Sequence, residues 1–269
     1  MRNEQGFMNV NGASLCYQVS GEGFPLVLIH AGIADQRMWD RQVEEFSKHF
    51  RVLRYDMRGF GQSKLPGGKF SNERDLAGLM DQLDIPKAHI AGISYGGLVA
   101  IEFALAFPER VSKMILGAPS VAGEEPSERL IEFWEAEDAA LDSGDLEQAT
   151  ELNLRLWVDG PSRVPEQIDP WVRNLVKDMQ LNIFKIPVPD DVDILPSGLP
   201  GIDRIPEISP ETLILVGELD LDEKLEIAER LSEEMPSARR QIIPGTAHML
   251  NMEKPEIFNE LVLEFLHND

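Results

Sequence analysis

The chain has 269 residues, 43% of them hydrophobic, which suits one large domain or a core with an inserted subdomain. Its 47 acidic and 25 basic residues give a net charge of −22, so we expect neither nucleic acid nor a membrane as a partner. No apolar run reaches the ~18 residues of a membrane span, and the N-terminus lacks the apolar stretch of a signal peptide. Since Cys16 is also the only cysteine, these features predict a cytoplasmic protein without an internal disulfide.

Short apolar runs alternate with amphipathic segments along most of the chain. Near-continuous apolar runs suit parallel strands that are covered on both faces, and they predict strands at residues 15–19, 25–30, 51–56, 89–93, 111–116, 212–216 and 240–243. The segments between them predict helices at residues 39–50, 73–83, 98–107, 224–235 and 255–267. This alternation indicates a doubly wound α/β sheet.

The alternation stops between residues 121 and 200. Helical patterns at 128–140, 146–158 and 170–181 give way to a Pro-rich stretch, and the segment holds three of the four tryptophans. It carries 18 acidic and 6 basic residues, hence a net charge of −12. We predict a helical cap at 121–200, inserted into a core made of 1–120 and 201–269. The alternative is a continuing core with irregular loops.

One pattern, Gly-x-Ser-x-Gly from Gly92 to Gly96, points to a nucleophile. It stands where a predicted strand passes into a predicted helix, and a serine there is presented to a cleft. Gly92 and Gly96 remove side chains that would collide in such a strained turn. The new helix aims its N-terminal N–H groups at the site, so the N–H of Tyr95 can stabilise an oxyanion beside Ser94.

A serine hydroxyl needs a general base, and His248 is the best placed of the five histidines. It lies in a loop directly after the last predicted strand, and such loops meet at the carboxyl edge of a parallel sheet, where Ser94 also lies. His89 falls on a predicted strand and is expected to pack. His49 and His267 lie near helix ends, where solvated or capping roles are expected.

The base in turn needs a carboxylate that holds its tautomer and stabilises the imidazolium. Asp220 follows the predicted strand at 212–216 and therefore lies at the same edge of the sheet. Glu218 and Asp222 stay as alternates, because an error of one turn residue would exchange them.

With these residues the chain resembles the α/β hydrolases that carry a cap domain, over nearly its whole length. The resemblance implies a mostly parallel eight-stranded sheet with helices on both faces and an inserted helical cap. The order Ser94, Asp220, His248 matches the order of the family's catalytic triad. The segment 28–32 resembles the family's strand-end His-Gly loop, with Ala31 in place of the usual glycine. By that resemblance the second oxyanion donor is the N–H of Gly32, with Ile33 as the alternate.

Two further segments resemble the family. Residues 55–63 resemble its Asp-x-Arg-Gly-x-Gly-x-Ser loop, which implies that Asp56 and Arg58 brace the loops beneath the site. Residues 247–255 resemble the catalytic-histidine segment of esterases and enol-lactonases. The sequence around Trp39 and His248 is most similar to that of 3-oxoadipate enol-lactonases.

The resemblance implies a cofactor-independent serine hydrolase that cleaves a small carboxylic ester or lactone through an acyl-enzyme. No metal-ligand spacing, phosphate loop or dinucleotide fingerprint is visible, so we expect neither a metal nor a cofactor. We expect a small-molecule substrate and a monomer or homodimer. The expected substrate pocket is apolar and lies under the cap. Its candidate residues are His30, Ile33, Trp134, Trp157 and Met249, with Trp171 also considered.

Other functions stay open. The architecture is shared by C–C bond hydrolases of ring-cleavage products, for which Arg155, Arg163 and Arg173 would bind substrate carboxylates. A proline iminopeptidase-like enzyme would use the acidic cap to recognise a substrate amine. Perhydrolase activity would be a side reaction of the same site. A non-catalytic ligand receptor on the same fold is the alternative from another class.

Overall fold

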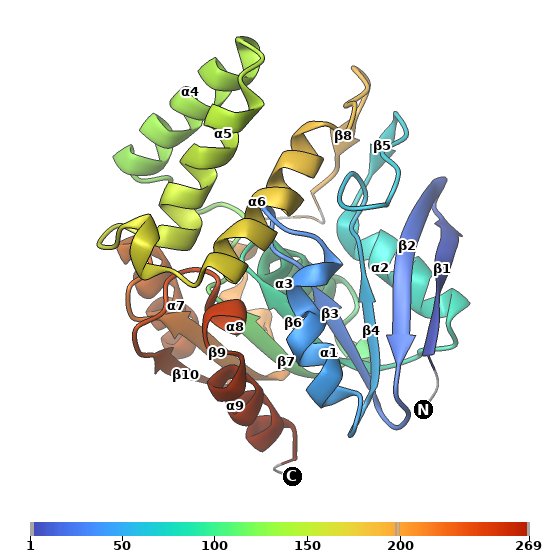
Figure 1. Ribbon diagram of the computed structural model, residues 1–269. Helices are drawn as coiled ribbons and strands as arrows, with labels where there is room; N and C mark the ends of the chain where they lie inside the picture. Colours follow the sequence, from blue (N-terminus) through green and yellow to red (C-terminus); the bar gives the residue numbers. More distant parts are fainter. Residues whose placement is uncertain (1–2, 197, 199, 268–269) are drawn as a thin grey trace.

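The computed structural model describes residues 3–196, 198 and 200–267, and a mixed sheet forms its centre (Figure 1). This sheet has eight strands in the order β1-β2-β4-β3-β6-β7-β9-β10, and only β2 runs against its neighbours. The strands are β1 (Asn3–Val10), β2 (Ala13–Ser20), β3 (Pro25–Ile29), β4 (Arg51–Tyr55), β6 (Ala88–Ile93), β7 (Val111–Gly117), β9 (Glu211–Gly217) and β10 (Ala238–Ile243). The predicted fold class, a mostly parallel eight-stranded α/β sheet, is confirmed.

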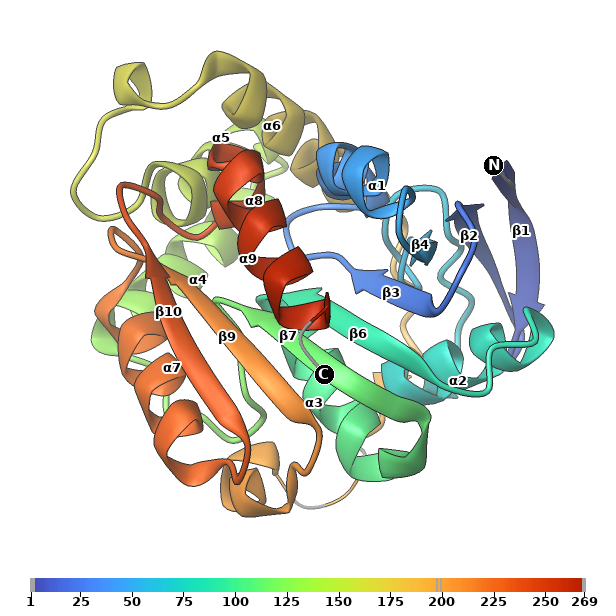
Figure 2. The ribbon, with the colours of Figure 1, turned by 90° about the horizontal axis from the view of Figure 1, so that it is seen from below.

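The central strands are apolar on both sides because helices cover both faces of the sheet. In β3, Leu26 and Leu28 pack into one apolar cluster, while Val27 and Ile29 pack into another. Figure 2 shows α1 (Asp40–Phe46), α8 (Leu250–Glu253) and α9 (Pro255–His267) on one face and α2 (Asn72–Gln82), α3 (Tyr95–Ala106) and α7 (Asp222–Glu234) on the other. All six residues of β6 are buried, so this strand fixes the middle of the molecule.

β1 is the strand that the apolar runs do not predict. Its residues alternate between exposed and half-buried up to the buried Val10, so it presents no continuous apolar stretch. It pairs with β2 from Asn3 to Val10 and ends the sheet at that edge. A short second sheet is made of β5 (Lys69–Phe70) and β8 (Asp193–Ile194). Each strand has only two residues, so the sequence pattern does not predict this sheet either.

Three helices lie between β7 and β9 in the chain, over the carboxyl ends of the parallel strands (Figure 1). They are α4 (Glu128–Asp142), α5 (Leu146–Asn153), which continues into a π-helical turn at Leu154–Asp159, and α6 (Pro170–Phe184). Each helix begins at a polar N-cap, because Ser127, Asp145 and Asp169 accept hydrogen bonds from backbone N–H groups of the first turn. The division at residues 121 and 200 stays a prediction, and positions 197 and 199 lie outside the described residues.

The loop after β4 is braced by two carboxylates. Asp56 accepts hydrogen bonds from the backbone N–H groups of Gln36 and Gln62, at 2.8 and 2.9 Å. Arg58 makes a two-pronged pair with Asp75, at 2.8 Å from Nε and 2.9 Å from Nη2, and both side chains are buried. These contacts are of the structural kind that the resemblance implies for Asp56 and Arg58.

We predict that Arg58→Leu lowers the free energy of unfolding by about 3–5 kcal/mol, because it removes the cation paired with the buried Asp75 carboxylate and leaves the Asn11 amide, at 3.0 Å, as its side-chain donor. Urea unfolding followed by circular dichroism measures the change. The control is Arg230→Leu, which removes the exposed pair with Glu234 and is expected to cost less than about 1 kcal/mol. Equal losses in the two variants would contradict the prediction.

Candidate active site

Ser94 stands in the turn between β6 and α3 with a backbone conformation that non-glycine residues rarely adopt. Its φ is 55° and its ψ is −116°, a strain on the order of 1–3 kcal/mol. The surrounding backbone holds it there: the N–H of Ser94 donates to the carbonyl of Gly117 at 2.8 Å, and its carbonyl accepts from Gly97 at 2.9 Å. The turn therefore fixes Ser94 at the carboxyl edge of the sheet.

Two glycines allow this turn. A Cβ on Gly92 would lie 2.1 Å from the carbonyl oxygen of Gly96, and a Cβ on Gly96 would lie 2.4 Å from that of Ile29. The β6–α3 turn thus touches the end of β3 directly. These contacts are the collisions that the sequence pattern leads one to expect.

His248 and Asp220 form a buried pair beside this turn. His248 Nδ1 lies 2.9 Å from Asp220 Oδ2, and both side chains are at most 2% exposed. The other oxygen of Asp220 accepts from the N–H of Leu221 at 2.8 Å. Because a carboxylate only accepts, Nδ1 of a neutral His248 carries the proton and Nε2 keeps its lone pair. Nε2 is buried and has no hydrogen-bond partner among the residues described.

The two alternates for the acid are engaged elsewhere. Glu218 accepts a hydrogen bond from the N–H of Gly245 at 2.8 Å, and Asp222 is the first residue of α7. The structure therefore pairs Asp220 with His248. Of the remaining histidines, His89 is buried against Phe24 and Phe50, and burial lowers its pKa to about 4.

Ser94 and His248 line one cavity of about 470 Å³ between the sheet edge and helices α4–α6. The helices contribute an aromatic wall, and the ring of Trp157 lies 4.6 Å from the ring of His248. Gly32 and Tyr95 line the same cavity, and a Cβ on Gly32 would lie 3.3 Å from that of Tyr95. The two backbone segments are therefore neighbours, next to Ser94.

The expected pocket residues divide into two groups. Ile33, Trp134 and Trp157 line the cavity, whereas His30 and Met249 are fully buried and do not. Trp171 does not line it either, and its ring lies against the guanidinium of Arg41. Met249 follows His248 and His30 lies two residues before Gly32, so both are close in sequence to residues that line the cavity.

His30 instead holds the loops together. Its Nδ1 donates to the carbonyl of Ala31 at 2.8 Å, and its Nε2 accepts from the N–H of Met57 at 2.9 Å. Burial lowers the pKa of His30, which keeps the ring neutral and able to accept this bond. The ring thereby ties the end of β3 to the end of β4.

Three polar side chains of the cavity wall were not predicted: Glu137 from α4, Asn153 from α5 and Gln180 from α6. The Glu137 carboxylate accepts a hydrogen bond from the side-chain amide of Asn153. Burial raises the pKa of Glu137 above its usual range. The sequence gives no signal for this residue, because it is one of 18 acids between residues 121 and 200.

The three arginines considered for substrate carboxylates are paired with acids of the protein. Arg155 and Arg173 both bind Asp159, at 2.9 Å each, and Arg163 binds Glu253. None of the three lines the cavity of Ser94. Within the described chain, no lysine or arginine lines this cavity.

Residues 26–261 match the alpha/beta hydrolase family, so the chain belongs to this family of hydrolytic enzymes. It is 30% identical to the 2-hydroxy-6-oxononadienedioate/2-hydroxy-6-oxononatrienedioate hydrolase of Comamonas testosteroni, over 99% of this chain and 94% of that protein. It is also 30% identical to the pimeloyl-(acyl-carrier protein) methyl ester esterase of Vibrio campbellii, over 94% and 98% of the two chains.

A solved structure agrees with this assignment. The enol-lactonase from Burkholderia xenovorans LB400 superimposes with a TM-score of 0.80 at 26% identity, covering 98% of this chain and 100% of that chain. This chain is thus similar to an oxononadienedioate/oxononatrienedioate hydrolase, to a methyl ester esterase and to an enol-lactonase. Membership shows hydrolase chemistry and leaves the substrate to be inferred from the site.

Two negative findings concern the described residues alone. They include no helix that is long and apolar enough to cross a membrane. They also include no group of three or more His, Cys, Asp or Glu side chains placed to hold a metal ion.

We predict that Gly96→Ala lowers the free energy of unfolding by about 1–3 kcal/mol or more, because the added methyl group meets the end of β3. Thermal and urea unfolding measure the loss. Gly6→Ala is the matched control, since its new Cβ has no contact closer than 3.8 Å and should change stability by less than about 0.5 kcal/mol. A Gly96→Ala protein as stable as the Gly6→Ala protein would refute this account of the turn.

Proposed function

We propose that the protein is a cofactor-independent serine hydrolase that cleaves small carboxylic esters or lactones through an acyl-enzyme on Ser94. The observation that supports this most is the shared cavity of Ser94 and His248. Asp220 holds Nδ1 of His248, so Nε2 remains available as the general base. Ser94, His248 and Asp220 are then the catalytic triad.

The proposed reaction has two halves. In the first, Ser94 Oγ attacks the carbonyl carbon while His248 Nε2 takes the hydroxyl proton, and Asp220 stabilises the imidazolium. The C–O bond of the ester then breaks, and His248 gives its proton to the leaving alcohol. In the second, His248 takes a proton from water, whose oxygen attacks the acyl carbon. The carboxylic acid leaves, and the proton returns to Ser94 Oγ.

The N–H groups of Gly32 and Tyr95 are the proposed oxyanion donors. Both residues line the cavity beside Ser94, and their backbones are neighbours. Neither N–H donates a hydrogen bond within the described part of the chain. Preorganised backbone donors of this kind stabilise the charge that develops on the carbonyl oxygen during attack.

We propose that residues 121–200 act as the cap that selects the acyl group. Helices α4–α6 supply the wall of Phe133, Trp134, Trp157, Ile183 and Phe184. This apolar wall suits an aliphatic or aromatic acyl chain. With no cation in the described lining and with Glu137 in the wall, the cavity disfavours a substrate that carries a second carboxylate. That argues for neutral esters and lactones over the anionic ring-cleavage products of C–C hydrolases.

Replacing the triad residues separates this proposal from a non-catalytic receptor. Ser94→Ala is expected to lower kcat for p-nitrophenyl hexanoate roughly 10⁶-fold, and Asp220→Asn on the order of 10⁴-fold. A fluorophosphonate probe should label Ser94 in the unmodified protein and fail to label Ser94→Ala. Circular dichroism checks that each variant is folded. A folded unmodified protein without an adduct at Ser94 would favour the receptor.

The negative charge of Glu137 in the cavity wall predicts a preference for substrates without a second carboxylate. kcat/KM for p-nitrophenyl hexanoate should exceed that for p-nitrophenyl hydrogen adipate, which adds a terminal carboxylate, by about tenfold or more. Glu137→Gln should reduce this preference, because it removes the like charge from the wall. The control is Glu135→Gln on the exposed side of α4, which should leave the ratio unchanged.

The opposite preference, for the adipate ester, would instead favour a function like that of the dioate C–C hydrolases. Adding an enol-lactone and an amino-acyl naphthylamide to the panel separates lactonase from aminopeptidase activity.

A further inference from the structure

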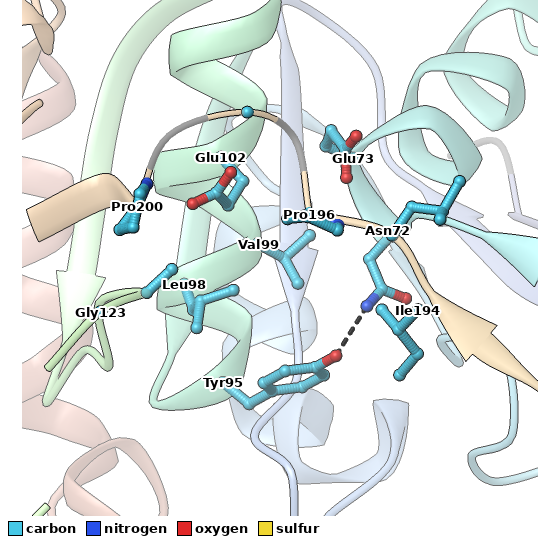
Figure 3. Close-up of a pocket in the computed structure, with 13 residues that line it drawn as sticks. Asn72, Glu73, Tyr95, Leu98, Val99, Glu102, Gly123, Ile194, Pro196 and Pro200 are labelled. Atoms are coloured by element: carbon cyan, nitrogen blue, oxygen red, sulfur yellow. Dashed lines mark hydrogen bonds between the residues drawn. The ribbon is translucent and has the colours of Figure 1, made fainter. Parts of the chain in front are cut away.

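A second cavity, of about 290 Å³, lies beside the cavity of Ser94. It is bounded by α2, by α3 and, among the described residues after β8, by Pro196 and Pro200 (Figure 3). Tyr95 and Ile194 line both cavities, so the two spaces adjoin. The walls include Leu98, Val99 and Pro196 and are mostly apolar.

Two carboxylates from neighbouring helices face this apolar space. Glu73 of α2 and Glu102 of α3 are 5% and 7% exposed, and both line the cavity (Figure 3). The side chain of Glu102 makes no hydrogen bond and no ion pair within the described residues. The nearest cation to Glu73 is the exposed Arg74, whose Nε lies 4.0 Å away. Arg204, whose charge acts on Glu102 from farther off, is bound to Glu207 at 2.8 Å.

No structural role accounts for both carboxylates. Glu73 lies in the first turn of α2, where a negative charge favours the helix. Glu102 lies in the interior of α3, where it caps nothing. A carboxylate without a partner in an apolar surrounding is costly, and burial together with the nearby Glu73 raises the pKa of Glu102. A cation in the cavity would remove that cost.

We propose that this second cavity binds a small organic cation, an ammonium group on an apolar body. The ammonium would donate hydrogen bonds to Glu73 and Glu102, and the apolar body would pack against Leu98, Val99 and Ile194. A hydrated metal ion suits the site less well, since the described residues around it offer few polar groups besides the two carboxylates. The side chain of Tyr95 would separate this ligand from Ser94, with its hydroxyl held by Asn72 at 2.7 Å (Figure 3).

Calorimetry with cyclohexylammonium, and with cyclohexanol as the neutral probe of similar shape, tests the proposal on the full chain at physiological salt. We expect saturable one-to-one binding of the ammonium and binding of cyclohexanol that is about tenfold weaker or more. The double variant E73Q/E102Q should lose affinity for the ammonium by a similar factor. E256Q/E260Q, which removes the same charge from exposed positions of α9, should bind like the unmodified protein.

Two results would overturn the proposal. One is equal binding of the ammonium by E73Q/E102Q and E256Q/E260Q, which would show only attraction to the acidic surface. The other is equal binding of ammonium and alcohol. Glutamine keeps the shape of glutamate, and thermal unfolding checks that E73Q/E102Q is folded. The single variant E102Q, with an expected loss of affinity in the same direction, serves where the double variant is unstable.

The cation has two possible sources, and labelling Ser94 with a fluorophosphonate distinguishes them. If the labelled protein still binds cyclohexylammonium, the site accepts a separate molecule. If labelling abolishes binding, and an ester with an amine at the far end of its acyl chain has a lower KM in the unmodified protein than in E102Q, the cation belongs to the substrate. The labelling step rests on the proposed function, whereas the calorimetric comparison of E73Q/E102Q with E256Q/E260Q needs no reaction at Ser94 and stands even if the proposed hydrolase activity fails.

Discussion

The contact between the β6–α3 turn and the end of β3 is the constraint on which the rest of the site depends. The carbonyls of Ile29 and Gly96 leave no room for a side chain at Gly96 and Gly92, respectively. With both side chains absent, Ser94 keeps a strained backbone and α3 begins directly beside the loop of Gly32. The buried middle of the sheet supplies the rigidity, because strain of this kind persists only where the surrounding structure determines it.

The other half of the site is built on the same principle at the ends of β9 and β10, which lie beyond β7 in the sheet. The N–H of Leu219 donates to the carbonyl of Thr246 at 2.8 Å, and that of Glu218 donates to Ile243 at 3.1 Å. These bonds join the loops after β9 and β10, so Asp220 and His248 meet although 28 residues separate them. The sheet thus positions the groups proposed to react, and helices α4–α6 form the wall that we propose selects the substrate.

Much of this was predictable because buried parallel strands leave long apolar runs and sharp turns require glycine. The runs at β3, β6 and β9 and the Gly92–Gly96 turn have that character. β1 was not predictable, since its residues before Val10 are half-buried at best. Glu137 was not, because what sets it apart is its place in a wall assembled from three helices. The second cavity depends on the two-residue pairing of β5 with β8, which no local pattern reveals.

The contact of Trp157 with His248 has a wider consequence. Trp157 lies in the π-helical turn that ends α5, a type of irregularity often found at functional sites. The ring of His248 therefore contacts the turn that ends α5, while its Nδ1 is held by Asp220 from the loop after β9. A shift of α5 along its axis would directly change the contact between Trp157 and the ring of His248. Helices α4–α6 and the sheet are thus not independent, and exchanging these helices for those of a relative would also change the environment of the imidazole.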